Sequence, residues 1–119
     1  MTPEEMKART KALGLEAIKL DQELPETRAA RVIGGQIVKS STSVGANYRA
    51  ACRARSRADF IGKLKIVEEE TDETIYWLEV LVDAKMVAPE RVEWLLKESN
   101  EILAIIVSSI NTSRGGQSQ

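Results

Sequence analysis

Residues 2–25 read TPEEMKARTKALGLEAIKLDQELP, and this stretch carries a full set of helix signals. Thr2 can cap a helix, Pro3 suits the first helical position, and Glu5 completes a capping box. Pro25 ends the pattern. Between these limits, apolar residues recur at spacings of three, four and seven: Met6, Leu13, Ala17, Leu20 and Leu24. The stretch therefore predicts an amphipathic helix with one buried face.

Three further helices follow from the same kinds of signal. The second is expected from about residue 27 to about residue 53, and the third begins at Ser56, which forms a Ser-x-x-Asp capping pattern with Asp59. Pro89 suits the opening of the fourth helix. The expected core faces are Phe60, Leu64, Val67, Leu78 and Leu81 in the third helix and Val92, Leu96, Leu103, Ile106 and Ile110 in the fourth.

The connections between these helices are short, and short connections favour antiparallel neighbours. No segment alternates with a period of two, as a half-buried strand would. We therefore predict the all-α class, with an antiparallel up-and-down four-helix bundle over residues 1–112. Residues 113–119, which include two consecutive glycines, are expected to form a disordered tail.

The third and fourth helices have more apolar residues than one core stripe needs. The additional residues are Ile75, Trp77 and Val80 in the third helix and Trp94, Leu95, Ile102, Ile105 and Val107 in the fourth. A wide core stripe with a few exposed apolar side chains would explain them. A second buried face at a contact between subunits is the explanation that we favour. The sequence thus predicts a homo-oligomer.

The composition excludes several classes of function. The chain has 119 residues, no histidine and a single cysteine, Cys52. Histidine-based catalysis, His-containing metal sites and a thiolate zinc cluster are therefore ruled out within one chain. No apolar run approaches the roughly 20 residues that span a bilayer, and a lone cysteine fits a reducing compartment. We expect a cytoplasmic protein with no enzyme activity, cofactor, metal or membrane contact.

The charges are distributed unevenly along a chain whose net charge is −1. Residues 28–65 contain nine basic side chains and one acid, which gives +8. Residues 1–27 carry −2, and residues 66–119 carry −7. Such asymmetry indicates either binding of a polyanion or pairing with an acidic surface.

The basic side chains of the second helix gather on one face, which we call the basic arc. At 100° per residue, the arc spans about 80° and consists of Arg28, Arg31, Lys39, Arg49 and Arg53. With Arg55 and Arg57 just beyond the helix, these residues are the candidates for nucleic-acid binding. The alternative is a solvated face, or one neutralised by acids of neighbouring helices. No aromatic residue lies in the arc, so a nucleic acid would be contacted mainly through its backbone.

A second set of side chains on this helix forms a polar seam beside the arc: Gln36, Ser40, Ser43 and Asn47. Its expected role is structural, because such side chains can hydrogen-bond across a close helix pair. The acids Glu68, Glu69, Glu70, Asp72 and Glu73 form the densest acidic group. Paired helical carboxylates can hold a metal, but charge pairing with the basic helix is the better interpretation. A metal-dependent hydrolase is the least favoured function.

Three segments resemble a known family. Residues 36–48, QIVKSSTSVGANY, are similar to the pattern Gln-Ile-x-Arg-Ser-x-x-Ser-Ile-x-x-Asn. Residues 56–64, SRADFIGKL, and residues 69–79, EETDETIYWLE, resemble two further signatures of the same family. The family consists of bacterial four-helix-bundle proteins encoded in intervening sequences of 23S ribosomal RNA genes, once labelled S23 ribosomal proteins. The likeness covers about residues 6–110.

The resemblance implies an antiparallel bundle that assembles into a homopentamer. It extends to the accessory variability protein of diversity-generating retroelements, which binds nucleic acid and a reverse transcriptase. Where many members have Asn-x-x-Glu-Gly, this chain has Asn47-Tyr48-Arg49-Ala50-Ala51, which removes an acid beside the basic arc. The usual aromatic-rich opening of the first helix is also missing.

The sequence therefore favours a non-enzymatic, oligomeric helical bundle whose basic surface binds RNA or DNA through phosphate contacts. The alternative is a scaffold for a protein partner, such as a reverse transcriptase, with the basic block serving subunit pairing. Salt-sensitive binding with little base preference would distinguish the first function from the second.

Overall fold

The computed structural model describes the backbone of residues 1–118 and the side chains of residues 1–115. It contains four long helices, α1 (Pro3–Glu23), α2 (Arg28–Cys52), α3 (Arg57–Asp83) and α4 (Glu93–Ser118), with a short 3-10 helix, η1 (Pro89–Val92), before α4. No strand occurs in residues 1–118. The predictions of an all-α class and a four-helix bundle are confirmed.

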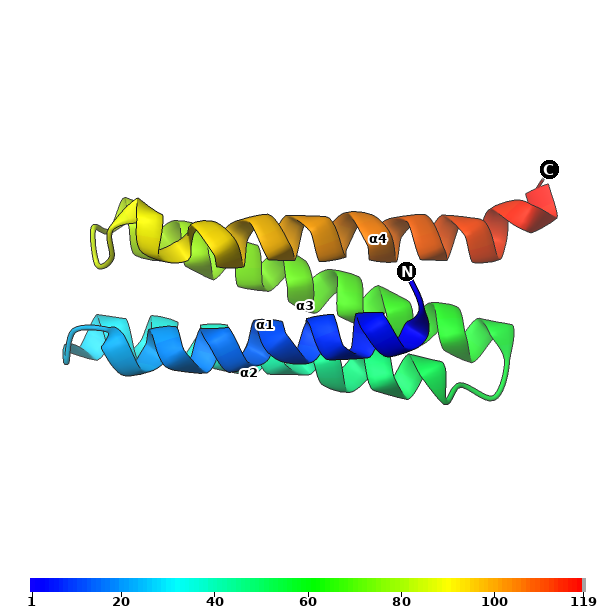
Figure 1. The fold of residues 1–119 in the computed structure, drawn as a ribbon, viewed down its shortest axis with the longest axis horizontal. Coiled ribbons are helices and arrows are strands. Elements are labelled where there is room, and N and C mark those ends of the chain that lie inside the picture. The colour runs from blue at the N-terminus through cyan, green and yellow to red at the C-terminus, as the bar shows by residue number, and fades with distance from the viewer. Residues whose placement is uncertain (119) are drawn as a thin grey trace.

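The chain reverses direction at each connection, so that consecutive helices lie side by side along the long axis (Figure 1). The molecule measures 49 × 23 × 21 Å. Extensive contacts join α1 to α2, α2 to α3, and α3 to α4, whereas α1 and α4 touch much less. The bundle is therefore closed less tightly between its first and last helices than along the other three interfaces.

The first three long helices begin at the residues that the sequence indicates, whereas Pro89, expected to open the fourth, opens η1, and α4 begins at Glu93. The Thr2 hydroxyl accepts a hydrogen bond from the backbone N–H of Glu5 at 3.1 Å, and the Glu5 carboxylate accepts one from the backbone N–H of Thr2 at 2.7 Å. Thr27 caps α2, and Ser56 caps α3 by accepting from the backbone N–H of Asp59 at 3.0 Å. Each cap satisfies backbone donors that a helix N-terminus leaves without a partner.

The end of α3 is closed by a Schellman turn. The backbone N–H of Met86 donates to the carbonyl of Leu81, and that of Lys85 donates to the carbonyl of Val82, both at 2.9 Å. Lys85 has a φ of 59°, the left-handed conformation that this turn requires. The turn ends α3 and leads the chain toward η1 and α4.

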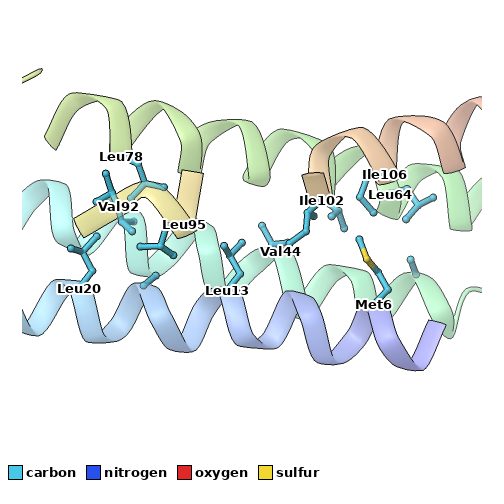
Figure 2. Packing of buried hydrophobic residues seen from close by; sticks show 14 of the residues in the cluster. Met6, Leu13, Leu20, Val44, Leu64, Leu78, Val92, Leu95, Ile102 and Ile106 are labelled. Carbon is cyan, nitrogen blue, oxygen red and sulfur yellow. The ribbon is translucent and has the colours of Figure 1, made fainter. Parts of the chain in front are cut away.

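A continuous apolar core runs between the helices (Figure 2). The predicted faces of α1 and α3 are largely confirmed, because Met6, Leu13, Ala17, Leu20, Leu64, Val67, Leu78 and Leu81 are buried. Phe60 and Leu24 are half-buried and pack against the core. From α2 the core receives Ile37, Val44 and Ala51.

The core face of α4 differs from the prediction. Val92, Ile106 and Ile110 are buried as expected, but Leu95 and Ile102 are the fully buried members, while Leu96 and Leu103 are half-buried. Glu98 of α4 is also buried, and Arg9 of α1 binds it. The residue before each of the two predicted leucines faces the core instead.

The expected second apolar face of α3 and α4 is also smaller than predicted. Ile75 joins Leu95 and Ile102 among the buried residues, and Trp77 and Ile105 are half-buried against the core. Val80 and Val107 are half-buried as well. Of that predicted set, only Trp94 is an exposed large side chain. A wide core stripe therefore accounts for most of these residues.

Two glycines allow α1 and α2 to approach closely. A Cβ atom on Gly14 would lie 3.3 Å from Cγ2 of Thr42, and one on Gly45 would lie 3.4 Å from the carbonyl carbon of Thr10. Side chains at these positions would separate the two backbones. Glycine therefore sets the spacing of the α1–α2 pair.

The last helix extends past the boundary expected from the sequence. The sequence predicts that the bundle ends at residue 112, but α4 continues to Ser118. The expected tail, residues 113–119, thus begins within this helix. Gln119 lies outside the described residues.

Candidate nucleic-acid interface

The basic arc lies on the side of α2 opposite its core face. Arg28, Arg31, Lys39, Arg49 and Arg53 are all exposed, as are Arg55 and Arg57 in the connection to α3 and at its start. None of these seven side chains forms an ion pair or hydrogen bond with any residue of the described part of the chain. Their charges are thus free to meet a partner.

The acids of the neighbouring helix do little to neutralise this surface. Burial and the nearby charge of Glu73 raise the pKa of Glu70, and Lys39 opposes them only as a charge acting at a distance. The remaining α3 acids make no ion pair with α2 in the described residues. Within one subunit, the acids of α3 therefore do not neutralise the basic arc.

The C-terminal end of the arc borders a hollow of about 610 Å³, which we call the corner hollow. Four of its lining residues come from consecutive turns of α2: Ala46, Arg49, Ala50 and Arg53. Arg55 closes it at the α2–α3 connection, and Asp59 and Lys63 line it from the start of α3. The hollow gathers three of the seven candidate residues. Arg28, Arg31 and Lys39 lie elsewhere on α2, and Arg57 does not line it.

Lys63 is a member of this group that the sequence analysis missed. It lies one turn after Asp59 and donates to its carboxylate at 2.7 Å. The Lys63 ammonium, and then the backbone N–H of Arg55 at 3.3 Å, hold the pKa of the Asp59 carboxyl below its usual range. Asp59 is therefore ionised at neutral pH, and the hollow presents four cations against one anion. The i, i+4 spacing of Asp59 and Lys63 is the only signal of this pair in the sequence.

The polar seam is only partly interhelical. Ser40 is buried, and its hydroxyl accepts a hydrogen bond from the Thr74 hydroxyl of α3 at 2.8 Å. Gln36, Ser43 and Asn47 are half-buried. The Asn47 amide donates to the Ser43 carbonyl of its own helix at 2.9 Å. The structural role is thus observed at Ser40, whereas Asn47 makes no bond to α3.

Arg9 links α1 to α4, and Arg91 of η1 links that segment to α1, and no local pattern in the sequence indicates either bridge. Arg9 donates from Nε and Nη2 to the two carboxylate oxygens of Glu98, at 2.6 and 3.0 Å, and it also binds Glu101. The Glu98 bond raises the pKa of Arg9. Arg91 makes the matching contact with Glu23, at 2.5 and 3.0 Å. The Arg9 pair thus joins α1 to α4, which touch much less than consecutive helices do, and the Arg91 pair joins α1 to η1.

The remaining candidates for chemistry stay isolated from one another. Among the described residues, no group of three His, Cys, Asp or Glu side chains is placed to hold a metal. Glu68, Glu69 and Asp72 instead border a hollow of about 450 Å³ beside α4. Cys52 is exposed. Burial, with a hydrogen bond to Cys52, raises the pKa of Tyr48 to about 12.

No helix in the described part of the chain is long and apolar enough to cross a membrane. The family model described as "23S rRNA-intervening sequence protein" matches residues 4–108. A comparison with curated proteins found no match. Among solved structures, the chain is similar to a protein of unknown function from the S23 ribosomal protein family of Bacteroides thetaiotaomicron VPI-5482. The two chains are 36% identical with a TM-score of 0.86, and the match covers 93% of this chain and 99% of the other.

Proposed function

The chain belongs to the 23S rRNA-intervening sequence protein family, and we propose that it binds RNA or DNA through phosphate contacts made by α2 and the α2–α3 corner. Neither the family description nor that of the structural neighbour names an enzyme activity. We accordingly propose that the protein is a non-enzymatic binding module. Its chemistry is the attraction between fixed cations and a polyanion.

The observation that carries this proposal is the set of seven exposed cations that have no partner within residues 1–115. Elsewhere in the described residues, five basic side chains form ion pairs, namely Lys7, Arg9, Lys19, Lys63 and Arg91, and five do not, namely Lys11, Lys65, Lys85, Lys97 and Arg114. What distinguishes the arc is that its unpaired cations share one face of α2. A row of unpaired cations on one helix face produces a positive field toward solvent. Because the arc has no aromatic side chain, binding should depend little on base sequence.

Replacing Lys39, Arg49 and Arg53 with glutamine should weaken binding to structured RNA for unrelated sequences alike. Glutamine has nearly the helix propensity of lysine and arginine, so the fold should survive. The slope of log affinity against log salt should fall by roughly 0.7–0.9 for each phosphate that the variant no longer binds. Fluorescence anisotropy across a salt series measures both quantities.

The matched control replaces Lys19, Lys85 and Lys97 with glutamine, which removes the same charge from α1, the α3–α4 connection and α4, away from the basic arc. This control should keep most of the slope. If the wild-type protein shows no salt-sensitive binding near ~50 mM salt, the nucleic-acid function is wrong and the scaffold function takes its place. If both triple variants reduce the slope equally, the arc is not the binding surface.

We further propose that the protein acts as a homo-oligomer, a pentamer by analogy with its family. Tyr76, Trp94 and Ile66 are exposed by 56%, 48% and 40% on α3 and α4, and large apolar side chains of this kind are common at subunit contacts. Light scattering at micromolar concentration should therefore give a mass several times 13.2 kDa. A monomer mass at that concentration would exclude the oligomer.

A further inference from the structure

We infer that the corner hollow is a seat for a single phosphate group, held by Arg49, Arg53 and Arg55. This inference rests on the proposed function and deepens it, because it replaces a diffuse basic face with one defined position. Arg49 of the last turns of α2, Arg53 at its C-cap and Arg55 of the α2–α3 connection all line the hollow. Guanidinium groups can bind phosphate oxygens with two parallel hydrogen bonds each, which suits them to this ligand.

The shape of the hollow depends on two small residues. Ala46 and Ala50 alternate with Arg49 and Arg53 along the same side of α2. Their methyl groups leave room for an anion between the longer basic side chains. An exposed helix face covered only by arginine and lysine would lack such a recess. The hollow of about 610 Å³ is larger than a phosphate group. It therefore has room for the phosphate and for part of the nucleotide that carries it.

Asp59 divides the cations of the hollow into two groups. Its carboxylate is engaged by Lys63 at 2.7 Å and by the backbone N–H of Arg55 at 3.3 Å. Lys63 is thereby compensated, and Arg55 also acts on Asp59 as a nearby charge, whereas the side chains of Arg49 and Arg53 form no ion pair or hydrogen bond in residues 1–115. The uncompensated charge thus lies on the α2 side of the hollow.

The source of the phosphate can be a nucleic-acid backbone or a free phosphate, and both carry the same oxygens. We would titrate the full chain with inorganic phosphate at low salt and follow the backbone amides by two-dimensional NMR. The expected result is a saturable shift, at millimolar phosphate, confined to residues around 46–63. A second titration with a short RNA that lacks a terminal phosphate should shift the same amides.

The decisive variant changes the shape of the hollow without changing its charge. Ala46→Leu should fold normally, because residue 46 lies at the rim of the hollow and outside the apolar core, while its larger side chain fills the recess. We expect it to weaken phosphate or RNA binding at this position about fivefold, and Arg55→Gln to do so about five- to tenfold. Lys19→Gln and Lys97→Gln remove the same charge away from both the basic arc and the hollow and should change the affinity by less than about twofold. Arg28→Gln, which lies on the arc but outside the hollow, should weaken RNA binding less than Arg55→Gln does. Circular dichroism checks the fold of each variant.

The outcomes separate this inference from the proposed function. Localised shifts with inorganic phosphate that Ala46→Leu weakens support a seat for free phosphate, and localised shifts with RNA alone support a seat for the backbone. If RNA binds but Arg28→Gln weakens it as much as Arg55→Gln, and Ala46→Leu has no effect, the seat is overturned and the proposed function stands. If phosphate occupies the seat but no RNA or DNA binds, the seat stands and the proposed function is overturned. The absence of any localised shift with either ligand overturns the seat.

Discussion

Replacing Ile102 with alanine should destabilise the protein by about 2–5 kcal/mol, the range for removing a fully buried aliphatic side chain. Ile102 is completely shielded from solvent in the core of the bundle (Figure 2). Its neighbour Leu103 is half-buried at the edge of α4. Leu103→Ala should therefore cost less than half as much, although the two side chains have the same number of carbon atoms. Urea denaturation measures the difference in the free energy of unfolding, provided that the m-value is the same for both variants.

The pair Leu95 and Leu96 repeats this comparison two helical turns earlier, since Leu95 is buried and Leu96 half-buried. Light scattering on each variant shows whether a loss of stability comes with a loss of oligomer mass, which would report a subunit contact. Equal costs for Ile102→Ala and Leu103→Ala, at unchanged mass, would contradict the orientation of α4 in the bundle.

Replacing Arg9 with glutamine should cost about 2–3 kcal/mol, somewhat below the range for a fully buried ion pair. The side chains of Glu98 and Arg9 are only 11% and 22% exposed. Removing the guanidinium would leave the Glu98 carboxylate largely shielded from water without its cation. The same change at Arg91 should have a much smaller effect, because its partners Glu23 and Glu16 are 55% and 33% exposed and stay hydrated.

A second substitution tests the cause of this destabilisation. In the Arg9→Gln background, Glu98→Gln should restore part of the stability, because a neutral amide is easier to bury than an unpaired carboxylate. Equilibrium unfolding of the four proteins in this double-mutant cycle gives the coupling between the two residues. If Arg9→Gln proves no more damaging than Arg91→Gln, the Arg9–Glu98 pair does not secure α4.

Local signals explain why most of the fold could be predicted from sequence. The caps at Thr2 and Ser56 act within one turn, and the spacing of Leu13, Ala17 and Leu20 is a property of one helix. Which of two adjacent residues of α4 faces the core could not be predicted in this way. Leucine or isoleucine occupies both positions of the adjacent pairs 95–96 and 102–103, and helical spacing suits either member. The choice depends on how α4 packs against distant parts of the chain, such as Arg9, which lies 89 residues from its partner Glu98.

The candidate site was predictable to the same extent. The basic arc follows from the periodicity of α2 alone, so its exposed position could be expected from the core face on the other side. The corner hollow could not be, because it needs the relative placement of α2, the connection and α3. Lys63 belongs to a different helix from Arg49 and Arg53, and sequence spacing does not show that they share one recess.

The unequal exposure of the two arginine bridges makes the response of the molecule to ionic strength directional. Dissolved ions screen an exposed pair such as Arg91–Glu23 more strongly than the shielded Arg9–Glu98 pair. Rising salt thus weakens first the link between the end of α1 and η1, which precedes α4. The opposite half of the α1–α4 boundary keeps the ion pair between Arg9 and Glu98. In concentrated salt, we accordingly expect α1 and α4 to begin to separate at the end of the bundle that holds the α3–α4 connection.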